Sequence, residues 1–84
     1  MSDSAEVKVA HCEIEVNGVH LREEHSFRTG LQIKEDAIAA GAKIKVSYVL
    51  DLETESGSVR IRDDQTVELH SGMKFTAHPG GSDS

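Results

Sequence analysis

Residues 12–21 read CEIEVNGVHL and decide the fold. Apolar side chains alternate with polar ones on both sides of the central pair, which is the pattern of half-buried β-strands. The pair itself, Asn17-Gly18, is the strongest short-range signal for a β-hairpin, because both residues tolerate the positive φ that the turn requires. We therefore predict a hairpin whose first strand carries Ile14 and Val16 on its inward face.

One helix is predicted after the hairpin. Thr29 stands at the N-cap position and Gln32 follows three residues later, which is the Thr-x-x-Gln capping box. Gly41 closes the run at the position where a left-handed C-cap residue belongs.

The two sides of this helix differ in character. Ile33, Ala37 and Ala40 share one face at about 100° per residue, and small side chains there would let the helix lie close to a sheet. Leu31 and Ile38 fall on the opposite side, flanked by Lys34 and Glu35. Either a loop covers these two side chains, or they form a contact patch for a partner protein.

The rest of the chain is predicted to be mostly β-structure. Alternating apolar residues predict a third strand over 44–50, followed by an acidic turn over 51–57. A short strand is expected over 58–62, residues 66–69 are ambiguous, and the last strand is expected over 73–77.

This order of elements predicts an α+β fold. A helix that connects a hairpin to later strands covers one face of their sheet. In a right-handed crossover the final strand pairs with the first in parallel, which is the β-grasp arrangement: a mixed sheet of four to five strands with one helix across one face. We expect residues 1–6 to be a disordered lead-in, 7–78 to form the domain, and 79–84 to form a flexible tail.

Composition excludes several classes of function. The 84 residues suffice for one small domain, and the formal charge of −6 disfavours partners such as nucleic acid and anionic membranes. No apolar stretch approaches the roughly 20 residues of a membrane span, and the first residues lack the pattern of a signal peptide. We expect a cytoplasmic protein that is a monomer when free.

Cysteine and histidine offer little for a catalytic or metal site. Cys12, the only cysteine, shares the inward face of its strand and is expected to behave as a small hydrophobe. No two histidines have the helical i, i+4 spacing of metal ligands, so we expect no metal, no cofactor and no enzymatic role. The five histidines are His11, His20, His25, His70 and His78.

The tail carries the strongest indication of function. Gly80-Gly81 precedes Ser82, and glycine lets a backbone thread the narrow channel of an enzyme and adopt whatever φ is imposed there. Pro79 biases the segment toward an extended shape, so His78 and Pro79 are candidates for recognition of the tail.

Together these features resemble the ubiquitin-like superfamily, and most closely the bacterial multiubiquitin-type domains. The resemblance covers roughly residues 10–81. The matching residues are Asn17-Gly18, Thr29-Gly30 with Ile33 and Ala37, the segment DDQTVEL over 63–69, and the segment GMKFT over 72–76.

The resemblance implies a protein modifier. Members of this kind are matured by a deubiquitinase-type peptidase, adenylated by a ubiquitin-activating-type enzyme, passed through a thioester to a conjugating enzyme and joined to protein targets. In bacteria such systems are associated with defence against phage. By this likeness the bond to be cut is Gly81–Ser82, and the Gly81 carboxylate forms the new bond. The segment Ala77-His78-Pro79 lacks the basic character of the ubiquitin tail, which favours a dedicated activating enzyme.

Two other functions fit the same pattern. A sulfur-carrier protein would bear a thiocarboxylate on Gly81, and a non-covalent β-grasp binding module would leave the tail inert. If the chain is a modifier, its lysines are candidate acceptors for a second copy. They are Lys8, Lys34, Lys43, Lys45 and Lys74.

Overall fold

The structure, a computed structural model, describes residues 12–80. The predicted lead-in over 1–6 and the last residues of the tail lie outside this range. In chain order the elements are β2 (Cys12–Val16), β3 (Val19–Glu23), β4 (Phe27–Thr29), α1 (Gly30–Ala39), β5 (Val49–Thr54), β6 (Gly57–Ile61), β7 (Thr66–Glu68) and β8 (Lys74–His78).

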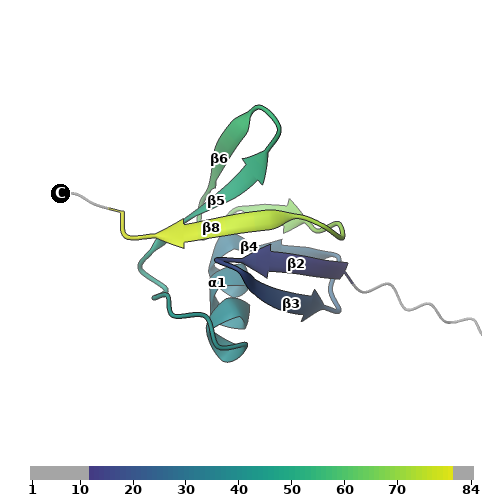
Figure 1. Cartoon of the computed structure of the whole chain (residues 1–84), viewed down its shortest axis with the longest axis horizontal. Coiled ribbons are helices and arrows are strands. Elements are labelled where there is room, and N and C mark those ends of the chain that lie inside the picture. The colour runs from purple at the N-terminus through teal and green to yellow at the C-terminus, as the bar shows by residue number, and fades with distance from the viewer. Residues whose placement is uncertain (1–11, 81–84) are drawn as a thin grey trace, which may run out of the picture.

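Five strands form one mixed sheet in the order β3-β2-β8-β5-β6. The final strand β8 lies in the centre, where it pairs in parallel with β2 and antiparallel with β5, as the predicted crossover requires. Figure 1 shows α1 lying across one face of this sheet. The predicted α+β class and the mixed sheet with one helix are confirmed for residues 12–80. A separate two-stranded sheet, β4 with β7, was not predicted.

The predicted hairpin is confirmed. β2 and β3 pair antiparallel with Val16 opposite Val19, so only two residues form the turn. Asn17 has φ 52° and Gly18 has φ 83°, the left-handed values that this turn requires.

The predicted ends of the helix are also confirmed. The Thr29 hydroxyl oxygen accepts a hydrogen bond from the backbone N–H of Gln32. The side-chain oxygen of Gln32 accepts one from the backbone N–H of Thr29, which completes the capping box. At the other end Gly41 has φ 106° and its amide donates to the carbonyl of Ile38. The amide of Ala42 donates to the carbonyl of Ala37, so the helix ends in a Schellman motif.

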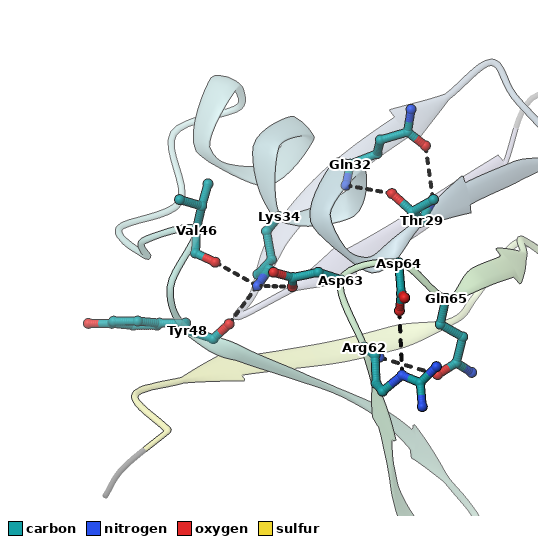
Figure 2. A network of polar contacts seen from close by, with 9 residues as sticks. All are labelled: Thr29, Gln32, Lys34, Val46, Tyr48, Arg62, Asp63, Asp64 and Gln65. Atoms are coloured by element: carbon teal, nitrogen blue, oxygen red, sulfur yellow. Dashed lines mark hydrogen bonds and ion pairs between the residues drawn. The ribbon is translucent and has the colours of Figure 1, made fainter. Parts of the chain in front are cut away.

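Residues 62–65 form a turn that closes the N-terminus of α1, and we call it the 62–65 turn (Figure 2). The amide of Gly30 donates to the carbonyl of Gln65, and the amide of Leu31 donates to the carbonyl of Asp63. The distance from nitrogen to oxygen is 3.1 Å in both hydrogen bonds. The first backbone N–H groups of a helix have no partner within it, so this turn supplies acceptors that the helix itself lacks.

The core lies between α1 and the large sheet and is mostly aliphatic. Every strand of the large sheet, the helix and β7 contribute to it, together with residues between α1 and β5 and one residue just after β7. Its members are Ile14, Val16, Leu21, Ile33, Ala37, Ala42, Ile44, Leu50, Ile61, Val67, Leu69, Phe75 and Ala77.

The inward face predicted for the helix is partly wrong. Ile33 and Ala37 are fully buried, as expected, but Ala40 is the exposed C-cap residue. Lys34, expected on the outer side, is buried in its place with only 2% of its surface exposed.

Lys34 is buried because the fold supplies three acceptors for its ammonium group (Figure 2). Its Nζ atom lies 2.6 Å from the carbonyl oxygen of Val46, from that of Tyr48 and from Oδ1 of Asp63. A buried charge is tolerated only when it is paired and hydrogen-bonded in this way. Of the five lysines that were candidate acceptors for chain formation, Lys34 has its ammonium group bound within the fold.

The same contacts correct the predicted third strand over 44–50. Residues 44–48 are not a strand, and β5 begins at Val49 and runs through the predicted acidic turn to Thr54. The carbonyls of Val46 and Tyr48 point at Lys34 and are not available to a neighbouring strand. Residues 51–53 continue as strand because they pair on both sides, with β8 and with β6, and Thr54 pairs with β6 alone.

Glu23, at the end of β3, is a second buried charged residue, with 5% of its surface exposed. Its Oε2 atom has no hydrogen-bond partner among the described residues, and Oε1 lies 3.8 Å from Nε of Arg28. Burial, and after it the nearby Asp36 carboxylate, raises the pKa of Glu23 from 4.5 to about 7, although Arg28 acts in the opposite direction. The folded state therefore keeps a proton that the unfolded chain releases, so stability falls as pH rises from about 4.5 to about 7.

Glu23→Gln is expected to remove this pH dependence and to stabilise the domain by about 1–2 kcal/mol at pH 8, because the amide keeps the shape of the side chain without its charge. Urea unfolding of both proteins at pH 5 and pH 8 measures the effect. The exposed neighbour provides the control, since Glu24→Gln should change stability by no more than about 0.5 kcal/mol. If Glu23→Gln loses as much stability as the parent between the two pH values, the assignment to Glu23 is wrong.

Candidate functional site at the end of the last strand

The candidate site is the C-terminal end of β8, where the chain leaves the sheet. β8 ends at His78, as expected for a strand followed by a proline, and Pro79 and Gly80 are exposed. The predicted conjugation and cleavage residues Gly81 and Ser82 lie outside the described residues. The structure therefore describes the approach to the predicted scissile bond up to Gly80.

Asn17 fixes this end of β8 from the β2 side. Its backbone amide donates to the carbonyl of Phe75 over 3.1 Å, which continues the parallel pairing of β2 with β8. Its side chain then adds two more hydrogen bonds: Nδ2 donates to the carbonyl of Ala77 over 2.9 Å, and the amide of Ala77 donates to Oδ1 over 2.8 Å. The side-chain amide of Asn17 thus makes the two hydrogen bonds to β8 that the backbone of β2 would make if that strand continued.

Asp51 fixes the same end from the β5 side. Its Oδ2 atom lies 2.8 Å from Nε2 of His78, and its Oδ1 atom accepts a hydrogen bond from Nε of Arg60 over 2.9 Å. The His78 hydrogen bond, together with Arg60, lowers the pKa of Asp51 below its ordinary value, so this carboxyl group is ionised at neutral pH. Three neighbouring strands therefore hold one ionic cluster on the face of the sheet away from the core.

His78 and Gly80 direct the first residues of the tail. The second ring nitrogen of His78, Nδ1, lies 3.2 Å from the carbonyl oxygen of Pro79. A Cβ atom at position 80 would lie 2.9 Å from Cγ1 of Val49, which is closer than real Cβ contacts come. Glycine at this position lets the backbone lie directly against the start of β5. We call Asn17, Asp51, His78 and Gly80 the tail exit.

The predicted partner patch is not part of the tail exit. Leu31 is half-buried and Ile38 is 38% exposed, and both belong to α1. The helix packs on one face of the sheet (Figure 1). Asp51 and His78 alternate with buried residues along β5 and β8, so they project from the other face. A partner protein that contacted both the predicted patch on α1 and the tail exit would have to reach around the domain.

The remaining candidates from the sequence do not form a site in the described part of the chain. Cys12 is half-buried on the inward face, and its Sγ atom donates to the carbonyl of Leu69 over 3.4 Å. Within residues 12–80, no group of three His, Cys, Asp or Glu side chains is placed to hold a metal ion. None of the helices described there is long and apolar enough to cross a membrane.

Sequence reasoning missed two of the four tail-exit residues in this role. Asn17 was assigned to the hairpin turn alone, and no local signal reports that its side chain reaches a residue 60 positions away. Asp51 was assigned to an acidic turn. The alternation of Leu50 and Leu52 around it would have placed it in a strand with its carboxylate facing outward.

Comparison of the chain with protein-family models, with curated proteins and with solved structures gives no match. Function therefore has to be inferred from the residues themselves and from the position in which β8 leaves the tail.

Proposed function

We propose that this domain has the β-grasp arrangement and acts as a ubiquitin-like protein modifier, the substrate of its enzymes. The observation that carries the proposal is the position of the tail. β5 pairs with β8 up to His78, β2 and the Asn17 side chain hold the other edge up to Ala77, and the next two residues, Pro79 and Gly80, are exposed. A folded domain whose central strand leads directly into the exposed residues Pro79 and Gly80 suits enzymes that must grip the domain and act on the residue that follows.

The chemistry comprises four substitutions at the Gly81 carbonyl carbon and one substitution at phosphorus, in which ATP activates the carboxylate. A peptidase hydrolyses the Gly81–Ser82 amide, so that water supplies the new carboxylate oxygen and the amine of Ser82 leaves. The carboxylate then attacks the α-phosphorus of ATP and releases pyrophosphate. A cysteine thiolate of the activating enzyme displaces AMP to form a thioester. After transfer to the conjugating enzyme, an amine of the target displaces the thiol and forms the final amide bond.

The proposal is tested by intact mass spectrometry of the chain mixed with ATP, a ubiquitin-activating-type enzyme and a deubiquitinase-type peptidase. We expect loss of Ser82, Asp83 and Ser84, followed by a thioester-linked adduct on the activating enzyme that a reducing thiol releases. Gly81→Ala should lower the rate of adduct formation about 100-fold, because an added Cβ displaces the reacting carbonyl in a channel shaped for glycine.

Ser84→Ala is the matched control, because it lies beyond the bond to be cut and should form the adduct at the parent rate. A stable thiocarboxylate on Gly81 in place of a conjugate would identify a sulfur carrier. An unchanged mass, with enzymes shown to be active on another substrate, would contradict both covalent functions and leave the non-covalent binding module.

A further inference from the structure

We propose that His78, Asp51 and the carbonyl of Pro79 form a proton-dependent latch that holds the tail against β5. The purpose that we assign to the latch, control of access to the Gly81 carboxylate, rests on the proposed function. Its structural basis concerns only residues that the structure describes. We call these three groups the tail latch.

The His78 ring lies between two hydrogen-bond acceptors. Nε2 faces a carboxylate oxygen of Asp51 at 2.8 Å, and Nδ1 faces the carbonyl oxygen of Pro79 at 3.2 Å. A neutral imidazole carries one N–H group, so it donates to only one of these oxygens and turns a lone pair toward the other. The imidazolium form carries two N–H groups and satisfies both. The complete latch therefore requires a protonated His78.

The groups around the ring keep the Asp51 end of the latch charged and oriented. Arg60 of β6 binds the other oxygen of Asp51, so the carboxylate cannot turn both oxygens toward the histidine. From the β2 side, the contact with this end of β8 comes from the uncharged side-chain amide of Asn17. Among the described residues, Asp51 is thus the charged group in direct contact with His78, and Arg60 acts through it.

The latch determines the direction of the tail because Pro79 lies directly before Gly80. While Nδ1 donates to the carbonyl of Pro79, the backbone of Gly80 stays against Val49, where no larger residue fits. An enzyme that encloses the tail has to lift Gly80 from this position. Only the protonated ring donates to both oxygens, so protonation of His78 favours the latched tail and loss of that proton favours the released tail.

The latch is tested by ¹⁵N relaxation of the Gly80 amide in the isolated chain at pH 5.5 and pH 8.0. We expect an order parameter near 0.8, close to that of rigid backbone, at pH 5.5 and a value below about 0.6 at pH 8.0. His78→Phe keeps an aromatic ring but removes both donors, so Gly80 should be mobile at both pH values. His20→Phe, an exposed histidine of β3 in the same sheet, should keep the pH dependence of the parent.

Asp51→Asn provides a second test that does not depend on the folding of the His78 variant. A side-chain amide donates to a neutral ring nitrogen and its oxygen accepts from a protonated one, so the latch should stay closed and Gly80 ordered at pH 8.0. Equal Gly80 order at both pH values in the parent, or a parent-like pH dependence in Asp51→Asn, would overturn the latch. Because no enzyme is present, these outcomes are independent of whether Gly81 is ever conjugated.

Discussion

Lys34→Met is expected to destabilise the domain by about 3 kcal/mol, a fall in Tm of the order of 15 °C for a domain of this size. Methionine fills most of the same volume, so the loss comes from the hydrogen bonds. The carbonyls of Val46 and Tyr48 lose a charged donor at 2.6 Å, and hydrogen bonds to charged groups are worth about 1.5–3 kcal/mol each. Asp63 adds less, because its side chain is 59% exposed and is rehydrated by water.

Thermal and urea unfolding measure this effect, and Lys43→Met is the matched control. Lys43 is exposed and lies in the same segment between α1 and β5, so its replacement should change stability by no more than about 0.5 kcal/mol. Hydrogen exchange should also show faster opening of residues 44–48 in Lys34→Met, since the ammonium group joins this segment to the helix. Equal stability of the two variants would show that the Lys34 contacts contribute nothing.

Gly30→Ala is the second large effect, and we expect a loss of about 3 kcal/mol. Helix propensity alone would favour the substitution by about 1 kcal/mol, because glycine is a poor helix residue. The new Cβ, however, would lie 3.0 Å from the carbonyl carbon of Arg62, closer still to its oxygen, and 3.1 Å from Cγ2 of Ile61. These are mainly backbone atoms, so relief requires the helix to move away from the 62–65 turn.

Such a movement would break the hydrogen bonds from Gly30 to Gln65 and from Leu31 to Asp63 that close the start of the helix. Gly72→Ala separates this steric effect from the conformational one: Gly72 has φ 92° and a Cβ there meets nothing within 4 Å. We expect Gly72→Ala to cost only about 1 kcal/mol, from the left-handed conformation alone. If Gly30→Ala unfolds at the same or higher denaturant concentration than the parent, the close approach of helix and turn is wrong.

The hairpin and both helix ends could be predicted because each depends on residues close together in sequence. Asn17 and Gly18 set their own φ, and Thr29 and Gln32 cap each other across three positions. The parallel pairing of β8 with β2 followed from the order of elements and the handedness of crossovers.

The remaining features depend on contacts between residues far apart in sequence. Lysine is usually a surface residue, so the sequence alone gives no reason to expect that Lys34 is buried. The reason is the three hydrogen-bond acceptors of its ammonium group, which lie 12 to 29 positions away in the sequence. The same contacts keep residues 44–48, the first part of the predicted strand over 44–50, out of the sheet although their apolar residues alternate. Likewise the tail exit depends on Asp51, whose carboxylate reaches the end of β8 only because β5 and β8 are neighbours.

The central position of β8 also has a mechanical consequence. If the tail joins this domain to another protein, any pulling force on that link enters through the C-terminal end of β8. The strand is paired with β2 on one side and β5 on the other, so a pull along its axis loads both ladders in shear and many hydrogen bonds must yield together. Resistance to forced unfolding is governed by the unfolding rate, so this arrangement makes the tail a strong point of attachment.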